Sequence, residues 1–246
     1  MAERLQVELE HRVGSLVVRV KFVLAADWTV LFGPSGSGKS TVLRTIAGLL
    51  RPDFGKVMHG EIKRRLVDTE TGLFLPPHLR PIRGAGQTAW LFPGKTVREN
   101  VAYGMGWSSH PEDQNQVLNE LLALFRLAAL SERKTTELSG GERQRVSVAR
   151  AVASAVTYDG PGHAILLLDE PFTGLDGALR DLLAVELRDW LGRWKVTVLS
   201  VTHDVAECFL LNAEVIRMAE GQIIEQGPVE HVLAGERERI LIELKA

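Results

Sequence analysis

The strongest chemical pattern in this sequence is a run of nine residues rich in glycine and serine. They are Gly33, Pro34, Ser35, Gly36, Ser37, Gly38, Lys39, Ser40 and Thr41. The run matches G-x-x-x-x-G-K-[ST], a loop whose glycines let successive N–H groups turn toward the α- and β-phosphates of a nucleotide. The Lys39 ammonium would reach the β- and γ-phosphates, and the Ser40 hydroxyl would bind Mg²⁺. The pattern predicts a site for a nucleoside triphosphate with Mg²⁺.

The flanking residues favour this interpretation over a glycine-rich turn that happens to contain a lysine. Trp28–Phe32 is a short apolar strand leading into the loop, and the residues from Thr41 to Gly48 are typical of a helix. The N-terminus of that helix would direct a partial positive charge at the phosphates. Upstream, His11 either stacks on a base or is an exposed histidine in a turn.

A second group of polar residues is predicted at strand ends. Asp169 and Glu170 follow the apolar run Ala164–Leu168, and His203 follows the β-branched run Val196–Thr202. Transfer of a phosphoryl group to water requires Mg²⁺ near the β/γ-oxygens and a base for the water. We therefore interpret Asp169 as the metal-side carboxylate and Glu170 as the general base. Each residue alone also fits an ordinary structural role.

Strands alternate with helices along the chain, which predicts a parallel sheet with ligands at the carboxyl ends of its strands. The region from Thr88 to Arg150 lacks a predicted strand and is expected to form a helical subdomain, and Thr69–Arg83 is expected to be a loop that its prolines keep from forming a helix. Further strands are expected at Leu5–Glu10, Ser15–Leu24, within Lys56–Asp68, and at Val215–Met218 and Gln222–Glu225. Helices are expected from Thr96, at Pro111–Leu130, from the Glu137 region through Ala153, at Gly177–Leu191 and at Pro228–Lys245. Another loop is expected at Tyr158–His163.

Composition limits the class of protein. The 246 residues are 45% hydrophobic and carry a net charge of −2, so no strong overall field draws the chain to nucleic acid or anionic lipid. The single cysteine, Cys208, excludes a disulfide within the chain and is expected to be buried and inert. We see neither a transmembrane segment nor a signal peptide.

A third motif, Leu138-Ser139-Gly140-Gly141-Glu142, resembles the Leu-Ser-Gly-Gly-Gln signature of the ABC-type ATPases. The resemblance covers essentially the whole chain, and it implies an α/β fold: a P-loop NTPase (RecA-like) parallel sheet core with an N-terminal antiparallel β subdomain and an inserted helical subdomain. We expect one domain over 1–246, with the core at 1–87 and 155–246, the helical subdomain at 88–154 and no C-terminal regulatory domain.

The resemblance also implies residue roles in hydrolysis of ATP. Ser139, Gly140 and Gly141 would close on the γ-phosphate of ATP held by a second copy of the chain. Gln87 would sense Mg²⁺ or the attacking water, His203 would hold the γ-phosphate, and Asp176 of the Gly174-Leu175-Asp176 loop would lie across the dimer interface. Catalytic roles thus fall to Glu170, His203 and Gln87, and Mg²⁺ ligation to Ser40, Gln87 and Asp169. Glu142 departs from the usual glutamine and adds a negative charge.

Two stretches indicate an importer. Leu91-Phe92-Pro93, followed by Thr96–Val101, resembles importer ATPases, in which this region meets a coupling helix of the permease. The stretch Leu75–Ile82 is similar to molybdate importer ATPases. We expect an ATP-hydrolysing subunit at the cytoplasmic face of the membrane, partnered by a second copy, a permease and, indirectly, a solute-binding protein, and not by nucleic acid.

Other functions were weighed against this one. An importer ATPase for sulfate, iron or polyamines has the same motifs. A soluble ABC ATPase acting on nucleic acid or ribosomes usually carries a coiled-coil insertion or two ATPase units, which this chain lacks. A P-loop kinase for a small molecule would not need the Ser139–Gly141 motif.

Overall fold

The computed structural model describes residues 3–105, 111–158 and 163–243. Contacts between residues divide the chain into two compact units. Unit 1 comprises Met1–Arg80 and Leu199–Ala246, and unit 2 comprises Pro81–Val198. Strand β9 (Thr197–Thr202) runs across the boundary between them. The expected loop at Tyr158–His163 and the last residues of the expected Pro228–Lys245 helix fall largely outside the described residues.

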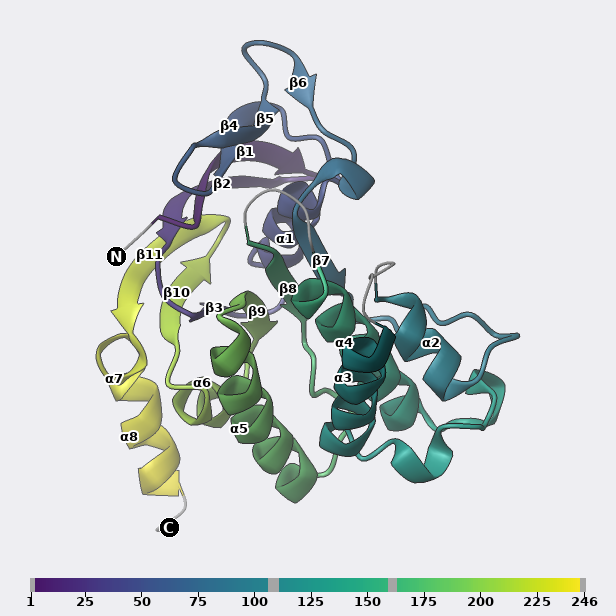
Figure 1. Ribbon diagram of the computed structural model, residues 1–246. Coiled ribbons are helices and arrows are strands. Elements are labelled where there is room, and N and C mark those ends of the chain that lie inside the picture. Colours follow the sequence, from purple (N-terminus) through teal and green to yellow (C-terminus); the bar gives the residue numbers. More distant parts are fainter. Residues whose placement is uncertain (1–2, 106–110, 159–162, 244–246) are drawn as a thin grey trace. The chain divides into compact units, whose positions relative to one another are not determined.

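Unit 1 contains strands in the order β6-β5-β4-β1-β2-β11-β10-β3 (Figure 1). Pairing is antiparallel from β6 to β2 and between β10 and β11, whereas β11–β2 and β10–β3 are parallel. The strands are β1 (Leu5–Val13), β2 (Leu16–Leu24), β3 (Trp28–Phe32), β4 (Phe54–His59), β5 (Arg64–Asp68), β6 (Leu73–Phe74), β10 (Glu214–Ala219) and β11 (Gln222–Pro228). The helices are α1 (Lys39–Ala47), the short 3-10 helix η1 (Pro77–Leu79), α6 (Val205–Leu210), α7 (Val229–Val232) and α8 (Ala234–Glu243).

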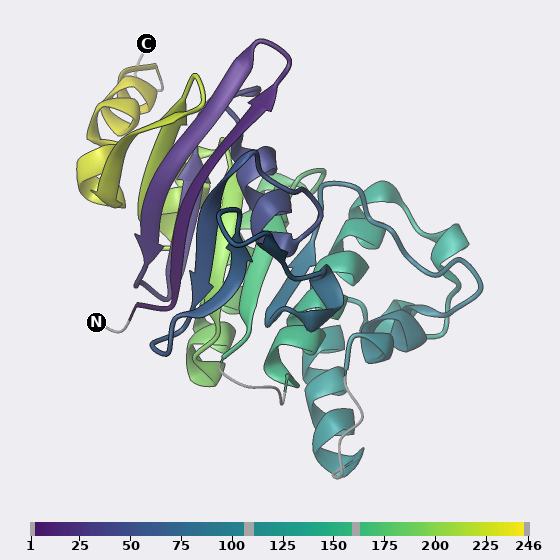
Figure 2. The same cartoon turned by 90° about the horizontal axis from the view of Figure 1, so that it is seen from above.

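The predicted N-terminal hairpin is confirmed and is the longest strand pair of unit 1 (Figure 2). Val13 pairs with Leu16 across a tight turn, in which Gly14 has a φ of +60° that suits glycine. Alternate side chains of β1, such as Leu5 and Val7, are buried, as expected of a strand with one covered face. His11 lies within β1 rather than in a turn, so the turn assignment was wrong.

Helix α1 is anchored at its C-terminal end by a buried arginine. The Arg80 side chain is 1% exposed, and its guanidinium donates to the carbonyl oxygens of Thr45 and Ile46 at 2.8 Å each and of Leu75 at 2.7 Å. Cations interact favourably with the carbonyl end of a helix dipole. Burial lowers the pKa of Arg80 to about 10, which leaves it charged near neutral pH. A Cβ at Gly48 would lie 2.7 Å from Nε of Arg80, so the arginine packs where only glycine leaves room.

Unit 2 contains two paired strands and a set of helices. β7 and β8 are parallel, with Ile82 opposite Ile165, and helix α4 packs on both strands. Helix α3 contacts both α4 and α5 (Figure 1). The elements of unit 2 are β7 (Ile82–Ala85), α2 (Val97–Tyr103), α3 (Pro111–Leu124), η2 (Ala128–Leu130), η3 (Thr135–Glu137), α4 (Gly140–Val156), β8 (Ile165–Asp169) and α5 (Gly177–Trp194).

The prediction for the segment before Gln87 was wrong. Thr69–Arg83 was expected to be a loop without helix, but it contains β6, η1 and the start of β7. η1 forms because Pro77 takes the first helical position, where a missing N–H costs nothing. β7 carries Arg83 and Gly84 at its centre, so it lacks the alternating apolar pattern that identifies a strand.

The predicted helix Pro111–Leu130 ends earlier, at Leu124. Arg126 has a φ of +55°, and the N–H groups of Arg126 and Leu127 return to the carbonyls of Ala123 and Leu122. This reversal is a common way for helices to end. The expected helix start at Thr96 is confirmed, because the Thr96 hydroxyl accepts from the Glu99 N–H, 3.2 Å away.

Cys208 is fully buried in α6, as expected. Burial raises the pKa of its thiol far above the ordinary value. Among the helices within the described ranges, none has the length and apolar character needed to cross a bilayer.

Candidate functional site

The phosphate-loop residues lie between β3 and α1 in unit 1, as the strand–loop–helix pattern predicted. Gly33, Gly36 and Gly38 have positive φ values of 154°, 81° and 101°. Two of these positions also lack space, since a Cβ at Gly33 would lie 2.1 Å from the Met218 carbonyl oxygen and one at Gly38 would lie 2.7 Å from Val18. The loop therefore requires glycine for both its backbone angles and its packing.

The Lys39 ammonium lies inside the loop. Its Nζ donates to the carbonyl oxygens of Gly33 and Pro34 at 2.7 and 2.8 Å, and it lies 3.5 Å from the Ser37 hydroxyl. Pro34, Ser35 and Gly36 are exposed above it. A phosphate bound to the loop N–H groups would thus meet a cation at its centre.

Helix α1 begins at Lys39 with an unoccupied cap. Its N-cap residue Gly38 is left-handed and makes no side-chain hydrogen bond to the helix, so no side chain satisfies the first N–H groups. The first N–H groups of a helix attract anions when no side chain caps them. The Ser40 side chain is exposed and Thr41 is partly buried, both in the first turn of α1.

In unit 2, β8 delivers the two carboxylates and the structure brings Glu170 together with Gln87. Asp169 is the last residue of β8, and Glu170 follows with a φ of +49°. The Gln87 side-chain amide donates to Oε2 of Glu170 at 3.2 Å. Gln87 follows β7, the strand paired with β8, which explains how residues 83 positions apart in sequence meet.

Thr173 is a contact of Glu170 that sequence reasoning missed. Its hydroxyl donates to the same Oε2 at 3.2 Å, and its N–H donates to the Glu170 carbonyl oxygen at 3.3 Å. A hydroxyl three residues after a carboxylate is the signal that could have indicated this turn.

The Ser139–Gly141 residues start helix α4, as predicted. Ser139 is the N-cap, and Glu142 completes a capping box: the Ser139 N–H donates to the Glu142 carboxylate at 2.7 Å, and the Glu142 N–H donates to the Ser139 hydroxyl at 3.3 Å. The hydrogen bond from the Ser139 N–H is the main cause, and the Ser139 hydroxyl the second, of a pKa of the Glu142 carboxyl below its ordinary value. Gly140 and Gly141 supply the first two N–H groups of the helix, which have no carbonyl partner within it.

The Gly174–Asp176 loop packs against the same helix start. A Cβ at Gly141 would lie 3.0 Å from the Gly174 carbonyl oxygen. Asp176 is the N-cap of α5 and accepts from the Leu179 N–H at 3.0 Å. The loop therefore has a fixed shape next to the exposed Ser139.

His203 is exposed directly after β9, in unit 1. The turn that holds it is fixed by its neighbours. The Thr202 hydroxyl accepts from the Asp204 N–H at 3.1 Å and donates to the Glu207 carboxylate at 3.0 Å, while the Glu207 N–H donates to Asp204 at 3.2 Å. Glu207, which is 4% exposed, was not singled out from sequence.

The residues expected to hold Mg²⁺ provide suitable donors. Ser40, Gln87 and Asp169 offer a hydroxyl, an amide and a carboxylate, and Mg²⁺ prefers such oxygen ligands, completed by water and phosphate oxygens. Ser40 belongs to unit 1, and the other two belong to unit 2. No cluster of three or more His, Cys, Asp or Glu side chains suited to a metal occurs among the described residues.

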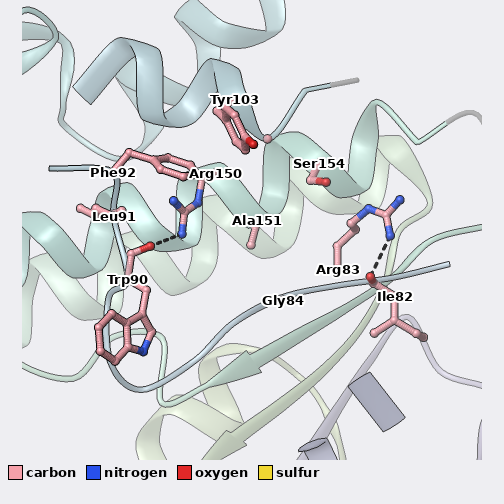
Figure 3. Close-up of a pocket in the computed structure, with 11 residues that line it drawn as sticks. Ile82, Arg83, Gly84, Trp90, Leu91, Phe92, Tyr103, Arg150, Ala151 and Ser154 are labelled. Atoms are coloured by element: carbon pink, nitrogen blue, oxygen red, sulfur yellow. Dashed lines mark hydrogen bonds between the residues drawn. The ribbon is translucent and has the colours of Figure 1, made fainter. Parts of the chain in front are cut away.

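An aromatic groove of about 510 Å³ lies on unit 2 (Figure 3). Phe92 and Tyr103 pack with ring centroids 4.3 Å apart, and the Arg150 guanidinium lies 5.4 Å from the Phe92 centroid and donates to the Trp90 carbonyl oxygen. The Trp90 side chain is 81% exposed. Desolvation lowers the pKa of Arg83 and Arg150, two of the lining residues. An apolar groove with exposed aromatics and cations is typical of a protein-binding surface.

Comparisons with solved structures agree with the fold described above. The chain is similar to a dimeric, post-hydrolysis structure of the ATP-binding cassette MJ0796 bound to ADP and Pi, with a TM-score of 0.71, 25% identity and coverage of 92% of this chain and 98% of that one. Its fold also matches cbiO1 from Clostridium perfringens, part of the ABC transporter complex cbiONQ, with a TM-score of 0.77, 24% identity and coverage of 99% and 96%. The predicted P-loop NTPase fold is confirmed.

Comparisons with curated proteins point the same way. The chain is 37% identical to a molybdenum import ATP-binding protein, ModC, of Mesorhizobium japonicum over 93% of its own length, and it spans 59% of that relative. It is 36% identical to a molybdate/tungstate import ATP-binding protein, WtpC, of Archaeoglobus fulgidus over 98% of its length, spanning 94% of that relative. The family model described as ABC transporter matches residues 20–173. With the phosphate loop, the Ser139–Gly141 helix start and the Asp169–Glu170 pair in place, the chain belongs to the ABC transporter family of ATP-binding proteins.

Proposed function

We propose that this chain is the ATP-hydrolysing subunit of an importer and that it works as a homodimer with two ATP molecules bound between the copies. The observation that carries the proposal is that one chain contains two helix starts at predicted phosphate-binding motifs, α1 after the phosphate loop and α4 after Ser139. The loop before α1 would grip the phosphates of one ATP, and Ser139, Gly140 and Gly141 would contact the γ-phosphate of the ATP held by the other copy. One copy alone would then lack a complete site.

The proposed role of each residue follows from its chemical group and from its position in the fold. Ser40, Gln87 and Asp169 would hold Mg²⁺, which neutralises charge on the phosphates when bound. Glu170 would accept the proton of the attacking water, with its carboxylate oriented by the hydrogen bond from Gln87. His203 would contact the γ-phosphate from its turn after β9, and Asp176 would lie near the second copy.

Coupling to transport is assigned to closure of the dimer and to the groove of unit 2. ATP contacts made only in the closed dimer would shift the population toward closure, and hydrolysis would release it. The groove at Trp90, Phe92, Tyr103 and Arg150 would receive a helix of a transmembrane permease, and the chain would then work at the cytoplasmic face of the membrane. A solute-binding protein would deliver the solute to that permease. We keep the division into a core of 1–87 and 155–246 and a helical subdomain of 88–154 as part of this proposal.

Molybdate or a similar oxyanion is the proposed solute. The support is the naming of two relatives, one for molybdenum and one for molybdate/tungstate import. Other relatives are named for import of Fe(3+) ions and of spermidine/putrescine, at 42% and 40% identity over 81% and 80% of this chain. The binding-protein partner would select the solute, so the choice among these must be tested in the assembled transporter.

The test is reconstitution of this chain with a candidate permease and a candidate molybdate-binding protein from the same organism. ATPase activity should rise on addition of molybdate with its binding protein, and a Trp90→Ala variant should lose this stimulation while keeping basal activity. Stimulation by ferric ion or spermidine and not by molybdate would overturn the solute assignment alone. Failure to bind the permease or hydrolyse ATP would overturn the function.

A further inference from the structure

We propose that Glu142 weakens nucleotide-driven closure of the dimer, because its carboxylate competes with the γ-phosphate for the N-terminus of α4. This inference rests on the proposed function, in which that N-terminus contacts ATP on the second copy. It concerns a residue that departs from the glutamine usual at this position, and it assigns that departure a consequence for the strength of the site.

The first argument is the geometry of the cap. The Glu142 carboxylate lies 2.7 Å from the Ser139 nitrogen, and the Ser139 hydroxyl accepts from the Glu142 N–H. The Ser139 N–H is therefore already bound to an anion of the same chain. What remains for a phosphate is the Ser139 O–H, as a donor, and the N–H groups of Gly140 and Gly141.

The second argument is charge. A carboxylate in the first turn is stabilised by the positive end of the helix dipole, and an incoming phosphate is attracted to that same end. Arg133 and Arg145 attract the Glu142 carboxylate and help keep it ionised. Its formal negative charge thus stands at the N-terminus of α4, 2.7 Å from the Ser139 nitrogen, and a dimer would carry two copies of it.

The third argument is that glutamine would preserve the cap and remove only the charge. The amide oxygen of a glutamine accepts from the Ser139 N–H as the carboxylate does, and capping boxes occur with either residue. The charge of Glu142 is therefore not needed to hold Ser139 in place. Besides its contribution to folding stability, the charge therefore acts on the electrostatics of the anion site.

The experiment compares Glu170→Gln with the double variant Glu142→Gln/Glu170→Gln, so that hydrolysis does not consume the bound ATP. The ATP concentration at half-maximal dimerisation, measured by analytical ultracentrifugation with Mg²⁺, should fall about threefold to tenfold in the double variant at low salt. The difference should shrink in 0.5 M salt, because screening weakens a charge effect more than a packing effect.

Two variants serve as controls. Glu99→Gln, also made in the Glu170→Gln background, changes the equivalent residue of the capping box at Thr96, where the Thr96 N–H donates to the Glu99 carboxylate at 2.7 Å. Without permease present, it should leave dimerisation as it is. Glu142→Ala removes charge and cap together, so it should lower the thermal stability by more than Glu142→Gln does.

The possible outcomes distinguish failure of the Glu142 inference from failure of the proposed function. If Glu170→Gln does not dimerise with ATP, the proposed function fails. If it dimerises but Glu142→Gln changes nothing, or tightens dimerisation equally at all salt concentrations, the competition by Glu142 is refuted and the function stands. If Glu99→Gln tightens dimerisation as much as Glu142→Gln, the effect is one of net charge and not of this helix end.

Discussion

Oε2 of Glu170 accepts two hydrogen bonds, one from the Gln87 amide and one from the Thr173 hydroxyl, each 3.2 Å long. The donors come from different segments, the end of β7 and the turn after β8. The carboxylate that we propose as the general base is therefore held by donors from two directions.

Replacing Glu170 by glutamine should stop turnover while keeping ATP bound. The amide cannot accept the proton of the attacking water, so the steady-state rate should fall by at least about 100-fold, and an ATP-bound dimer should accumulate. Phosphate release and gel filtration with ATP would measure the two effects. Glu186→Gln, which alters an exposed carboxylate paired with Arg126, should behave as wild type; a normal rate in Glu170→Gln would show that another residue is the base.

Removing the Thr173 hydroxyl should slow hydrolysis without weakening ATP binding. Thr173→Val keeps the shape of the side chain but leaves Glu170 with one donor fewer, and loss of one hydrogen bond of about 0.5–1.5 kcal/mol corresponds to roughly a twofold to tenfold fall in kcat. Thr173→Ser should restore the rate. Steady-state kinetics separate kcat from KM, and a rise in KM alone would contradict a positioning role.

Lys39→Ala should lose nucleotide affinity. Hydrogen bonds to charged groups contribute about 1.5–3 kcal/mol, so the Kd for ATP should rise roughly tenfold to a hundredfold. Titration calorimetry would measure this, with Lys56→Ala as a control, because Lys56 lies on β4, outside the phosphate loop, and pairs with the exposed Glu70. Equal affinity in Lys39→Ala and wild type would exclude the loop as the phosphate site.

A pair of glycine substitutions tests the packing of the phosphate loop. Gly33→Ala should destabilise the protein by about 1–3 kcal/mol, because its Cβ would lie 2.1 Å from the Met218 carbonyl oxygen. Gly192→Ala, in α5 with nothing within 4 Å of the new Cβ, should instead gain about 0.5–1 kcal/mol. Urea unfolding measures both, and a Gly33→Ala protein as stable as wild type would mean that the strand and loop can shift apart.

Acid should weaken both capping boxes. The pKa values of Glu99 and Glu142 are lowered in the folded chain, first by the backbone hydrogen bonds of Thr96 and Ser139. A carboxyl with a depressed folded pKa contributes stability above its unfolded pKa and loses it as pH falls through the folded pKa. Stability should therefore decline below about pH 4.5, and the decline should be shallower in a Glu99→Gln/Glu142→Gln variant, as followed by thermal unfolding at several pH values.

The elements that were predicted well are those whose signal is local. The phosphate loop needs glycines at fixed spacing, the hairpin at Gly14 has alternating strands, and β8 is a continuous apolar run, so each could be identified within a few residues. Family membership was also expected from short motifs, and it is confirmed by the family model.

Two of the features that were missed, the burial of Arg80 and strand β7, depend on partners far away in sequence. Arg80 binds carbonyls 34 and 35 residues before it, and nothing in its own neighbourhood indicates that a guanidinium would be buried there. β7 is held as a strand by its pairing with β8, 83 residues later in register, although Arg83 and Gly84 give it no strand pattern. Thr173 and Glu207 act through side-chain hydrogen bonds that periodicity does not predict.

The buried guanidinium of Arg80 has a consequence for how the chain is connected. It ties Arg80, at the end of the first segment of unit 1, to the C-terminal end of α1. Six residues, Pro81 to Gly86, connect this anchored arginine to Gln87, and four of them form β7. Within that connection only Pro81 and Gly86 lie outside a strand, so little backbone freedom remains between the anchor and the glutamine.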